Sequence, residues 1–343
     1  MKKLLLLLIF GILIVVSFGC KDDDGTTMGI DDDMPPIDTL PCLDALDSLT
    51  VPAINVDTML QLDDCPLSWV EIYPERYRYL SPSFNPNNME EVALIRLDNQ
   101  TFEYRLCILN LCSGELDVLE AEAFNGVDWG TNGWILFSKL DLQVWKVRPD
   151  GSGQQRLTSI GENSSPIWND EGDRIAYSLT NTGEFFILDE EGNAVDTVKG
   201  MENREACDWS ATNKLITPFE PGSADDIYYF DLDLDTLIKI DEEGNEAYIH
   251  DGKWGKEERL YWLAQYQLAY TDINTKERTV LFKLADGFNN RFYRSFTISP
   301  DYKHIILNRE DWKQLNECDV EVVHSLYIMD IDGSNERKVL IPE

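Results

Sequence analysis

The sequence predicts an all-β protein folded as a six-bladed β-propeller of four-stranded antiparallel blades. An aromatic or apolar residue followed by a turn recurs six times, with successive spacings of 45, 39, 41, 45 and 44 residues. This matches the period of a propeller blade, about 40–45 residues. The anchors of the repeat are Phe84, Trp129, Trp168, Trp209, Trp254 and Ile298. Six anchors predict six blades, which the segment 61–343 is long enough to form as one domain.

A short apolar run follows each anchor and its turn, and is expected to form the second strand of the blade. These runs are 92–95, 134–137, 175–177, 215–217, 260–262 and 305–307. They alternate little between apolar and polar residues, as expected for strands covered on both faces. Polar turns such as 149–152 and 190–193 follow, and their glycines allow the positive φ angles of tight hairpins. The blades are expected at about 80–120, 121–160, 161–200, 201–243, 244–286 and 287–343.

Two units resemble the TolB-type propeller repeat. One runs from Val144-Trp145-Lys146-Val147 through 155–158 to 168–177, and the other begins at Ile298-Ser299-Pro300-Asp301. The second, fourth and fifth units match less well. The resemblance covers about residues 80–343 and implies the propeller fold. It implies little about function, since propellers include binding modules, scaffolds and enzymes.

The first nineteen residues have the parts of a secretory signal. Lys2 and Lys3 precede an apolar run of about fifteen residues, which is short for a membrane span. The end of this run, Val16-Ser17-Phe18-Gly19-Cys20, resembles a bacterial lipobox. The resemblance implies cleavage before Cys20 and acylation, for example with palmitate, of that cysteine. Two or more acyl chains anchor a protein stably to a membrane. The alternative is an ordinary cleaved signal with an incidental cysteine.

Residues 20–60 are expected to form a disordered acidic tether between the anchor and the propeller. Acidic runs occur at 22–24 and 31–33, and such segments with few aromatics do not fold. The first run resembles the export signal of lipoproteins on the outer face of the outer membrane, with the periplasm as the alternative location. Thr39, Ser48 and Thr58 each lie between an Asp and an apolar residue. This pattern resembles a bacterial O-glycan acceptor motif.

The formal net charge of −34 excludes nucleic acid as a partner, because such a surface repels polyanions. Divalent cations and basic protein patches remain compatible with it. Apart from Cys20, six cysteines remain, which permit three disulfides in an exported chain. We favour Cys42 with Cys65, which would join the tether to the propeller, and consider Cys207 with Cys318. A bond between Cys107 and Cys112 would need Cys112 in a turn.

The binding face is expected at the end of the propeller that carries the second-to-third turns and the blade-to-blade connections, because these segments vary in length. The longest is expected to be a loop from 309 to 324, which contains Trp312 and His324. Arg204 and Arg291 lie in comparable connections and are candidates for the same face. The alternatives are a loop held only by a disulfide and solvated arginines.

No catalytic constellation is evident in the sequence. The three histidines, His250, His304 and His324, are scattered, and there is no nucleophile elbow or phosphate-binding loop. Asp231, Asp233 and Asp235 are weak candidates for a calcium site; an acidic turn is the simpler interpretation. We therefore expect no cofactor, with calcium as the exception.

The leading hypothesis is a non-catalytic surface lipoprotein with a monomeric propeller that binds a protein or glycan partner. The first alternative is an extracellular carbohydrate lyase, hydrolase or lactonase with a metal in the propeller channel. The second alternative is a periplasmic accessory protein of an envelope complex.

Overall fold

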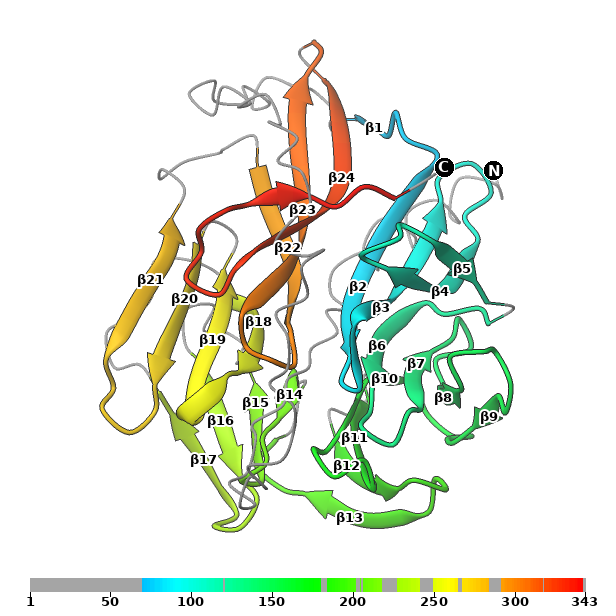
Figure 1. Cartoon of the computed structure of the whole chain (residues 1–343). Coiled ribbons are helices and arrows are strands. Elements are labelled where there is room, and N and C mark those ends of the chain that lie inside the picture. The colour runs from blue at the N-terminus through cyan, green and yellow to red at the C-terminus, as the bar shows by residue number, and fades with distance from the viewer. Residues whose placement is uncertain are drawn as a thin grey trace, which may run out of the picture.

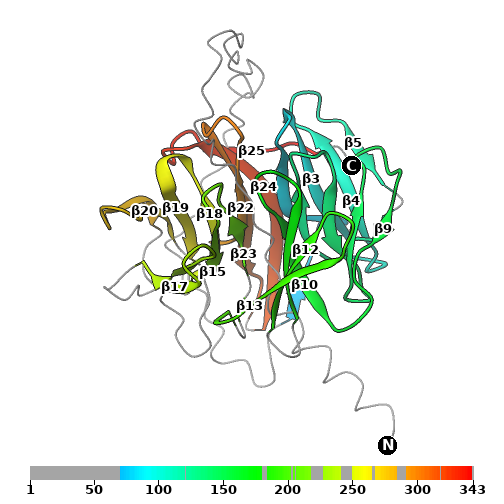
Figure 2. The same cartoon turned by 90° about the horizontal axis from the view of Figure 1, so that it is seen from below.

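The computed structural model describes residues 70–119, 121–179, 184–201, 204, 206–217, 227–240, 249–264, 267–283, 291–316 and 318–341. Its strands form six antiparallel sheets arranged as the blades of a propeller (Figures 1 and 2). Each sheet takes its four blade strands from one contiguous segment. The predicted six-bladed all-β fold is therefore confirmed. Within the described residues, no helix is long and apolar enough to cross a membrane.

The first three blades follow one another along the chain. Blade 1 contains β2 (Tyr77–Asn85), β3 (Asn88–Asp98), β4 (Tyr104–Asn110) and β5 (Leu116–Val118). Blade 2 contains β6 (Asn125–Trp129), β7 (Ile135–Ser138), β8 (Val144–Val147) and β9 (Gln155–Arg156). Blade 3 contains β10 (Asn163–Trp168), β11 (Arg174–Leu179), β12 (Phe185–Asp189) and β13 (Ala194–Val198).

The last three blades repeat this order. Blade 4 contains β14 (Asp208–Trp209), β15 (Lys214–Thr217), β16 (Tyr228–Asp231) and β17 (Thr236–Lys239). Blade 5 contains β18 (Ile249–Trp254), β19 (Arg259–Ala264), β20 (Gln267–Asp272) and β21 (Arg278–Lys283), with a 3-10 turn at Lys256–Glu258. Blade 6 contains β22 (Arg291–Ile298), β23 (His304–Gln314), β24 (Asp319–Asp330) and β25 (Arg337–Lys338).

Each predicted anchor is buried at the end of the first strand of its blade, and six apolar clusters fill the seams between neighbouring blades. Trp254, for example, is fully buried and packs on Cys207 and Ile216 of blade 4. Its indole N–H donates to the carbonyl oxygen of Lys214 at 3.0 Å. The second strands are buried on both faces, which explains their near-continuous apolar sequence.

Buried side chains also clasp neighbouring blades together through backbone hydrogen bonds. The carboxylate of Asp128 accepts the N–H of Trp168 at 2.7 Å, and that of Asp208 accepts the N–H of Trp254 at 2.7 Å. Asp251 accepts the N–H of Phe296 at 3.0 Å in the same way. A buried N–H without a partner is costly, so these carboxylates hold the innermost strands in register.

The ring closes through packing between the first and last blades. Phe84 and Leu94 of blade 1 lie in one cluster with Ile306 and Leu326 of blade 6. The Asn308 amide also donates to the carbonyl oxygen of Tyr79. Before blade 1, β1 (Val70–Ile72) pairs in parallel with β24, and adds a strand to blade 6. The last blade thus contacts both the segment that precedes blade 1 and blade 1 itself.

The polar turns between third and fourth strands use glycine where the backbone requires it. Gly192, between β12 and β13, has a φ of 92°. A Cβ at this position would lie 2.9 Å from the carbonyl oxygen of Leu157 in blade 2. A side chain here would therefore disturb both the turn and the contact between blades 2 and 3.

The cysteines differ from our expectation at Cys207. Cys112 and Cys318 each take part in a disulfide, whereas Cys107 and Cys207 are buried thiols outside any disulfide. The expected Cys207–Cys318 bond is therefore wrong, because Cys207 packs in the apolar seam between blades 4 and 5. Cys20, Cys42 and Cys65, like Thr39, Ser48 and Thr58, lie outside the described residues.

Differential alkylation should distinguish these two classes of thiol. We expect alkylation of Cys107 and Cys207 to require unfolding but no reduction. Burial blocks access to both thiols and raises the pKa of the Cys107 thiol to about 12. Cys112 and Cys318 should be alkylated only after reduction. Peptide mass spectrometry reads both classes in one digest, and alkylation of Cys207 in the folded protein would contradict its burial.

Candidate functional site

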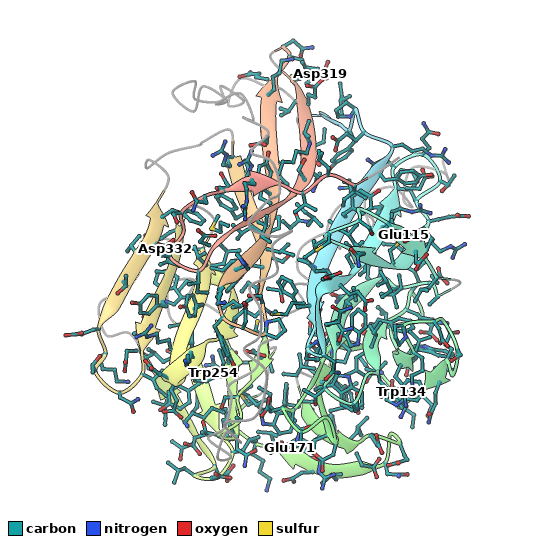
Figure 3. The ribbon with its side chains drawn as sticks, in the orientation of Figure 1. Glu115, Trp134, Glu171, Trp254, Asp319 and Asp332 are labelled. Carbon is teal, nitrogen blue, oxygen red and sulfur yellow. The ribbon has the colours of Figure 1, made fainter. Side chains whose placement is uncertain are left out.

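We expected a loop from 309 to 324. The structure instead shows that this segment is the projecting half of a long β-hairpin. β23 and β24 pair from His304 with Asp330 as far as Gln314 with Val320. In Figures 1 and 3 the hairpin extends above the ends of the other blades, with Asp319 near its tip. We call the end of the propeller that carries this tip and the β3–β4 turn (99–103) of blade 1 the hairpin face.

The two faces of β23 carry separate polar networks, and Glu310 is the centre of the one that faces blade 1. Its carboxylate accepts hydrogen bonds from Arg294 at 2.6 Å and from the Trp312 indole at 3.1 Å. The Nε2 atom of His324, on β24, lies 3.4 Å from Glu310. The ring of Tyr73, just beyond β1, lies 5.7 Å from the imidazole ring. The chain that enters blade 1 therefore covers this network.

Arg309 is the centre of the network on the opposite face of β23, toward blade 5. Its guanidinium, 1% exposed, lies 2.8 Å from Asp311 and 3.1 Å from Glu336. It also stacks on the ring of Tyr327 at 3.5 Å and donates to that hydroxyl group. Arg291 pairs with the same Asp311 at 3.3 Å. Charged side chains are rarely this buried unless they are paired, and here each charge has a partner.

The electrostatics of the Glu310 network keep its carboxylate ionised and its imidazole neutral. Burial alone would raise the pKa of the Glu310 carboxyl, but the Arg294 guanidinium and the hydrogen bonds from Arg294 and the Trp312 N–H favour its ionised form and hold the pKa below its ordinary value. Burial lowers the pKa of His324 from 6.5 to about 4, although Glu310 opposes this shift. The imidazole is therefore uncharged at neutral pH, and within the described part of the chain neither of its nitrogens makes a hydrogen bond.

The stability of the fold should fall with acidification because of His324. Between pH 6.5 and about 4 the unfolded chain protonates this imidazole whereas the folded chain does not, so unfolding is favoured as the pH falls. The shift corresponds to a loss of roughly 3 kcal/mol across this range. Replacing His324 with Gln should flatten the dependence, as measured by urea unfolding at pH 7, 6, 5 and 4. An unchanged slope would contradict the burial of a neutral imidazole.

The structure brings two of the four predicted binding residues together, and places a third on the opposite face of β23. Trp312 and His324 lie in the Glu310 network, and Arg291 lies in the Arg309 network. Trp312 and His324 are buried, so they support the hairpin rather than offer their side chains to a partner. Arg204 lies apart from them, buried beside Tyr228 of blade 4, with its guanidinium 4.7 Å from the ring.

The acidic turn at 231–235 is explained by its backbone. The Asp231 carboxylate accepts the N–H groups of Asp233 and Leu234, and Asp235 has a φ of 50°. Asp233 accepts from the Asn213 amide. Among the described residues, no group of three His, Cys, Asp or Glu side chains is arranged to hold a metal ion.

Sequence reasoning missed the residues that matter most in these networks. Arg309, Glu310 and Asp311 read as a charged interruption after the apolar run 305–307, which is typical of a loop. They are buried because successive residues of a strand point to opposite faces, where each finds an opposite charge. The interleaving of carboxylates and arginines at 291, 294, 309, 310 and 311 was the available signal.

Comparison with known proteins supports the fold. No protein-family model matches the sequence, and no curated protein matches it. An acylaminoacyl peptidase superposes on 78% of this chain, at 13% identity and a TM-score of 0.51. The Pyrococcus horikoshii acylaminoacyl peptidase superposes on 77%, at 13% identity and a TM-score of 0.50. This chain spans about half the length of these two proteins, 54% and 52%. The β-propeller domain of the trilobed protease from Pyrococcus furiosus is similar over 78% of this chain and 96% of its own, with 11% identity and a TM-score of 0.48.

Proposed function

We propose that this protein is a non-catalytic binding module, held at the outer face of the outer membrane by acylated Cys20, whose hairpin face contacts a protein or glycan partner. The observation that carries the proposal is the β23–β24 hairpin. Its strands have 11 and 12 residues, whereas the equivalent strands have 11 and 7 in blade 1 and 4 to 6 in blades 2 to 5. A hairpin in which both strands are this long is well placed to meet another molecule.

The polar networks support a binding role, because they make the hairpin rigid. Glu310 is held by Arg294 on one face of β23, and Asp311 is held by Arg291 and Arg309 on the other. Their charges are therefore paired within the protein and stabilise the hairpin. A rigid element loses little conformational entropy on binding, which favours affinity.

The tip of the hairpin offers the side chains that would make the contact. Leu315 is 45% exposed, and the Lys313 side chain is 71% exposed although it lies 3.7 Å from Glu321. An exposed apolar residue beside a basic group fits an interface in which a few anchors carry most of the energy. On a chain with a net charge of −34, a lysine at the tip also offers a site of local positive charge.

Partner capture from intact cells tests this proposal. We expect a variant with Lys313→Glu and Leu315→Asp to lose at least about tenfold of the crosslinked partner, since each lost contact costs about 1 kcal/mol or more. The matched control is Leu234→Asp, which places the same charge at a 67%-exposed leucine on the opposite face. Equal recovery of the partner by both variants, with unchanged thermal stability, would refute the hairpin as the contact.

A further inference from the structure

Two arginines lie over one tyrosine at the start of blade 1, and a third lies directly across the sheet from one of them. The guanidinium carbons of Arg76 and Arg96 lie 5.0 and 4.4 Å from the centre of the Tyr77 ring. Arg105, on β4, is the direct cross-strand partner of Arg96 on β3. We call Arg76, Arg96 and Arg105 the arginine corner. Blade 1 contains no lysine, so arginine supplies its positive charge.

The arginine corner is incompletely neutralised. Arg76 pairs with Asp98 at 3.0 Å, and Arg105 lies 3.7 Å from Glu103. In the part of the chain that the structure describes, no carboxylate lies within ion-pair distance of Arg96, although the protein carries 63 acidic residues. Arg96 and Arg105 lie directly opposite each other on neighbouring strands. Like charges in such positions destabilise a sheet. An anion between these two guanidinium groups would relieve that repulsion.

An exposed aromatic side chain lies at the same end of blade 1. Phe102 is 69% exposed and has a φ of 58°, in the turn between β3 and β4. A bulky residue is uncommon at a positive φ. In the next turn of this blade, between β4 and β5, the residue with a positive φ is Gly114. The N–H of Phe102 donates to the carbonyl oxygen of Asp98, the residue paired with Arg76. The ring is therefore anchored to the turn that bounds the arginine corner.

We infer that the arginine corner and Phe102 bind the acidic segment Ile30-Asp31-Asp32-Asp33-Met34 of this chain. The segment combines the two chemistries that the surface offers, since its three carboxylates suit guanidinium groups and its flanking Ile30 and Met34 suit the Phe102 ring. The side chains of Arg76 and Arg105 are 56% and 38% exposed, so both can be reached.

The segment is close enough along the chain to reach this surface. Residue 34 precedes β1 by 36 residues, and a random coil of that many residues would have an r.m.s. end-to-end distance of roughly 33 Å. The corner itself begins at Arg76, four residues after the end of β1. Joining a ligand to its site by such a linker gives an effective concentration of about a millimolar. A weak ionic contact is thus sufficient, and an acidic partner would have to compete with it.

The test uses a fluorescent peptide of residues 21–40 and the full chain with Asp22, Asp23, Asp24, Asp31, Asp32 and Asp33 all changed to Asn. We expect the peptide to bind the chain that carries the Asp→Asn changes. It should bind the unsubstituted chain about tenfold more weakly, because there the natural segment competes for the surface. Adding Arg96→Gln and Arg105→Gln should weaken binding about tenfold, as should raising the salt from 0.05 to roughly 0.5 M.

Control variants separate the arginine corner from general electrostatics. Arg156→Gln and Arg174→Gln remove guanidinium groups of similar exposure, 43% and 40%, from blades 2 and 3, and should leave the affinity unchanged. Phe102→Ser should weaken binding without changing its salt dependence. Equal affinity for the unsubstituted and Asp→Asn chains, or equal affinity after loss of Arg96 and Arg105, would overturn the inference. This outcome does not depend on whether the hairpin tip binds a partner.

Discussion

Replacing Asp251 with Ala is expected to destabilise the propeller by about 3–5 kcal/mol, because it leaves the buried Phe296 N–H without its acceptor and the fully buried Lys253 without its acidic neighbour. Asp251 is fully buried on β18, accepts the N–H of Phe296 at 3.0 Å and lies 3.9 Å from the amine of Lys253. Burial raises the pKa of Asp251 and lowers that of Lys253. Without the Asp251 side chain, Lys253 loses its acidic neighbour and the clasp between blades 5 and 6 is lost.

A double-variant cycle isolates this effect. Lys253→Met should cost much less, because Asp251 can then take a proton and still accept the Phe296 N–H. The variant with both changes should be more stable than Asp251→Ala alone, since no charge remains buried. Urea unfolding at pH 7 gives the four free energies. A cost below about 1 kcal/mol for Asp251→Ala would contradict the assigned burial of the pair.

Replacing Glu310 with Ala is expected to cost a similar amount, about 3–5 kcal/mol, and to loosen the projecting hairpin. The substitution leaves the Arg294 guanidinium and the Trp312 indole N–H without their shared acceptor. Among the described residues, Glu310 is the only carboxylate within ion-pair distance of His324. Its removal should therefore make the imidazole still harder to protonate.

The matched control is Glu321→Ala, on β24 near the tip of the same hairpin. Glu321 pairs with Lys313 at 3.7 Å, and the lysine is 71% exposed, so this pair should contribute less than about 1 kcal/mol. Glu310→Gln should fall between the two, because the amide oxygen can still accept one hydrogen bond. Hydrogen exchange along β23 and β24 measures the loosening. Equal protection in Glu310→Ala and Glu321→Ala would show that the Glu310 network does not hold the hairpin.

The repeat in the sequence was sufficient to predict the fold, because the same physical demand recurs in each blade. Trp129, Trp168, Trp209 and Trp254 all end an innermost strand and fill a seam, and the apolar runs after them are covered on both faces. Even the weaker anchors, Phe84 and Ile298, occupy this position. Periodicity of burial is visible in sequence, so it could be read before the structure.

The candidate site was predicted less well, because it depends on partners that are distant in sequence. Nothing near Glu310 indicates that Arg294 and His324 will meet it across two neighbouring strands. The absence of a disulfide at Cys207 likewise follows from its place in a seam. The aspartates that precede Trp129 and Trp209 were visible in sequence, but their role in clasping the next blade requires knowledge of the ring.

The most direct test of the binding role is a photo-crosslinking amino acid at Leu315, with Leu234 as the matched position on the opposite face. Both side chains are exposed, at 45% and 67%. After irradiation of intact cells, we predict a discrete adduct at Leu315 and none at Leu234, identified by mass spectrometry. Adducts of equal yield at both positions, or one at Leu234 alone, would contradict the assignment of the hairpin face as the binding surface.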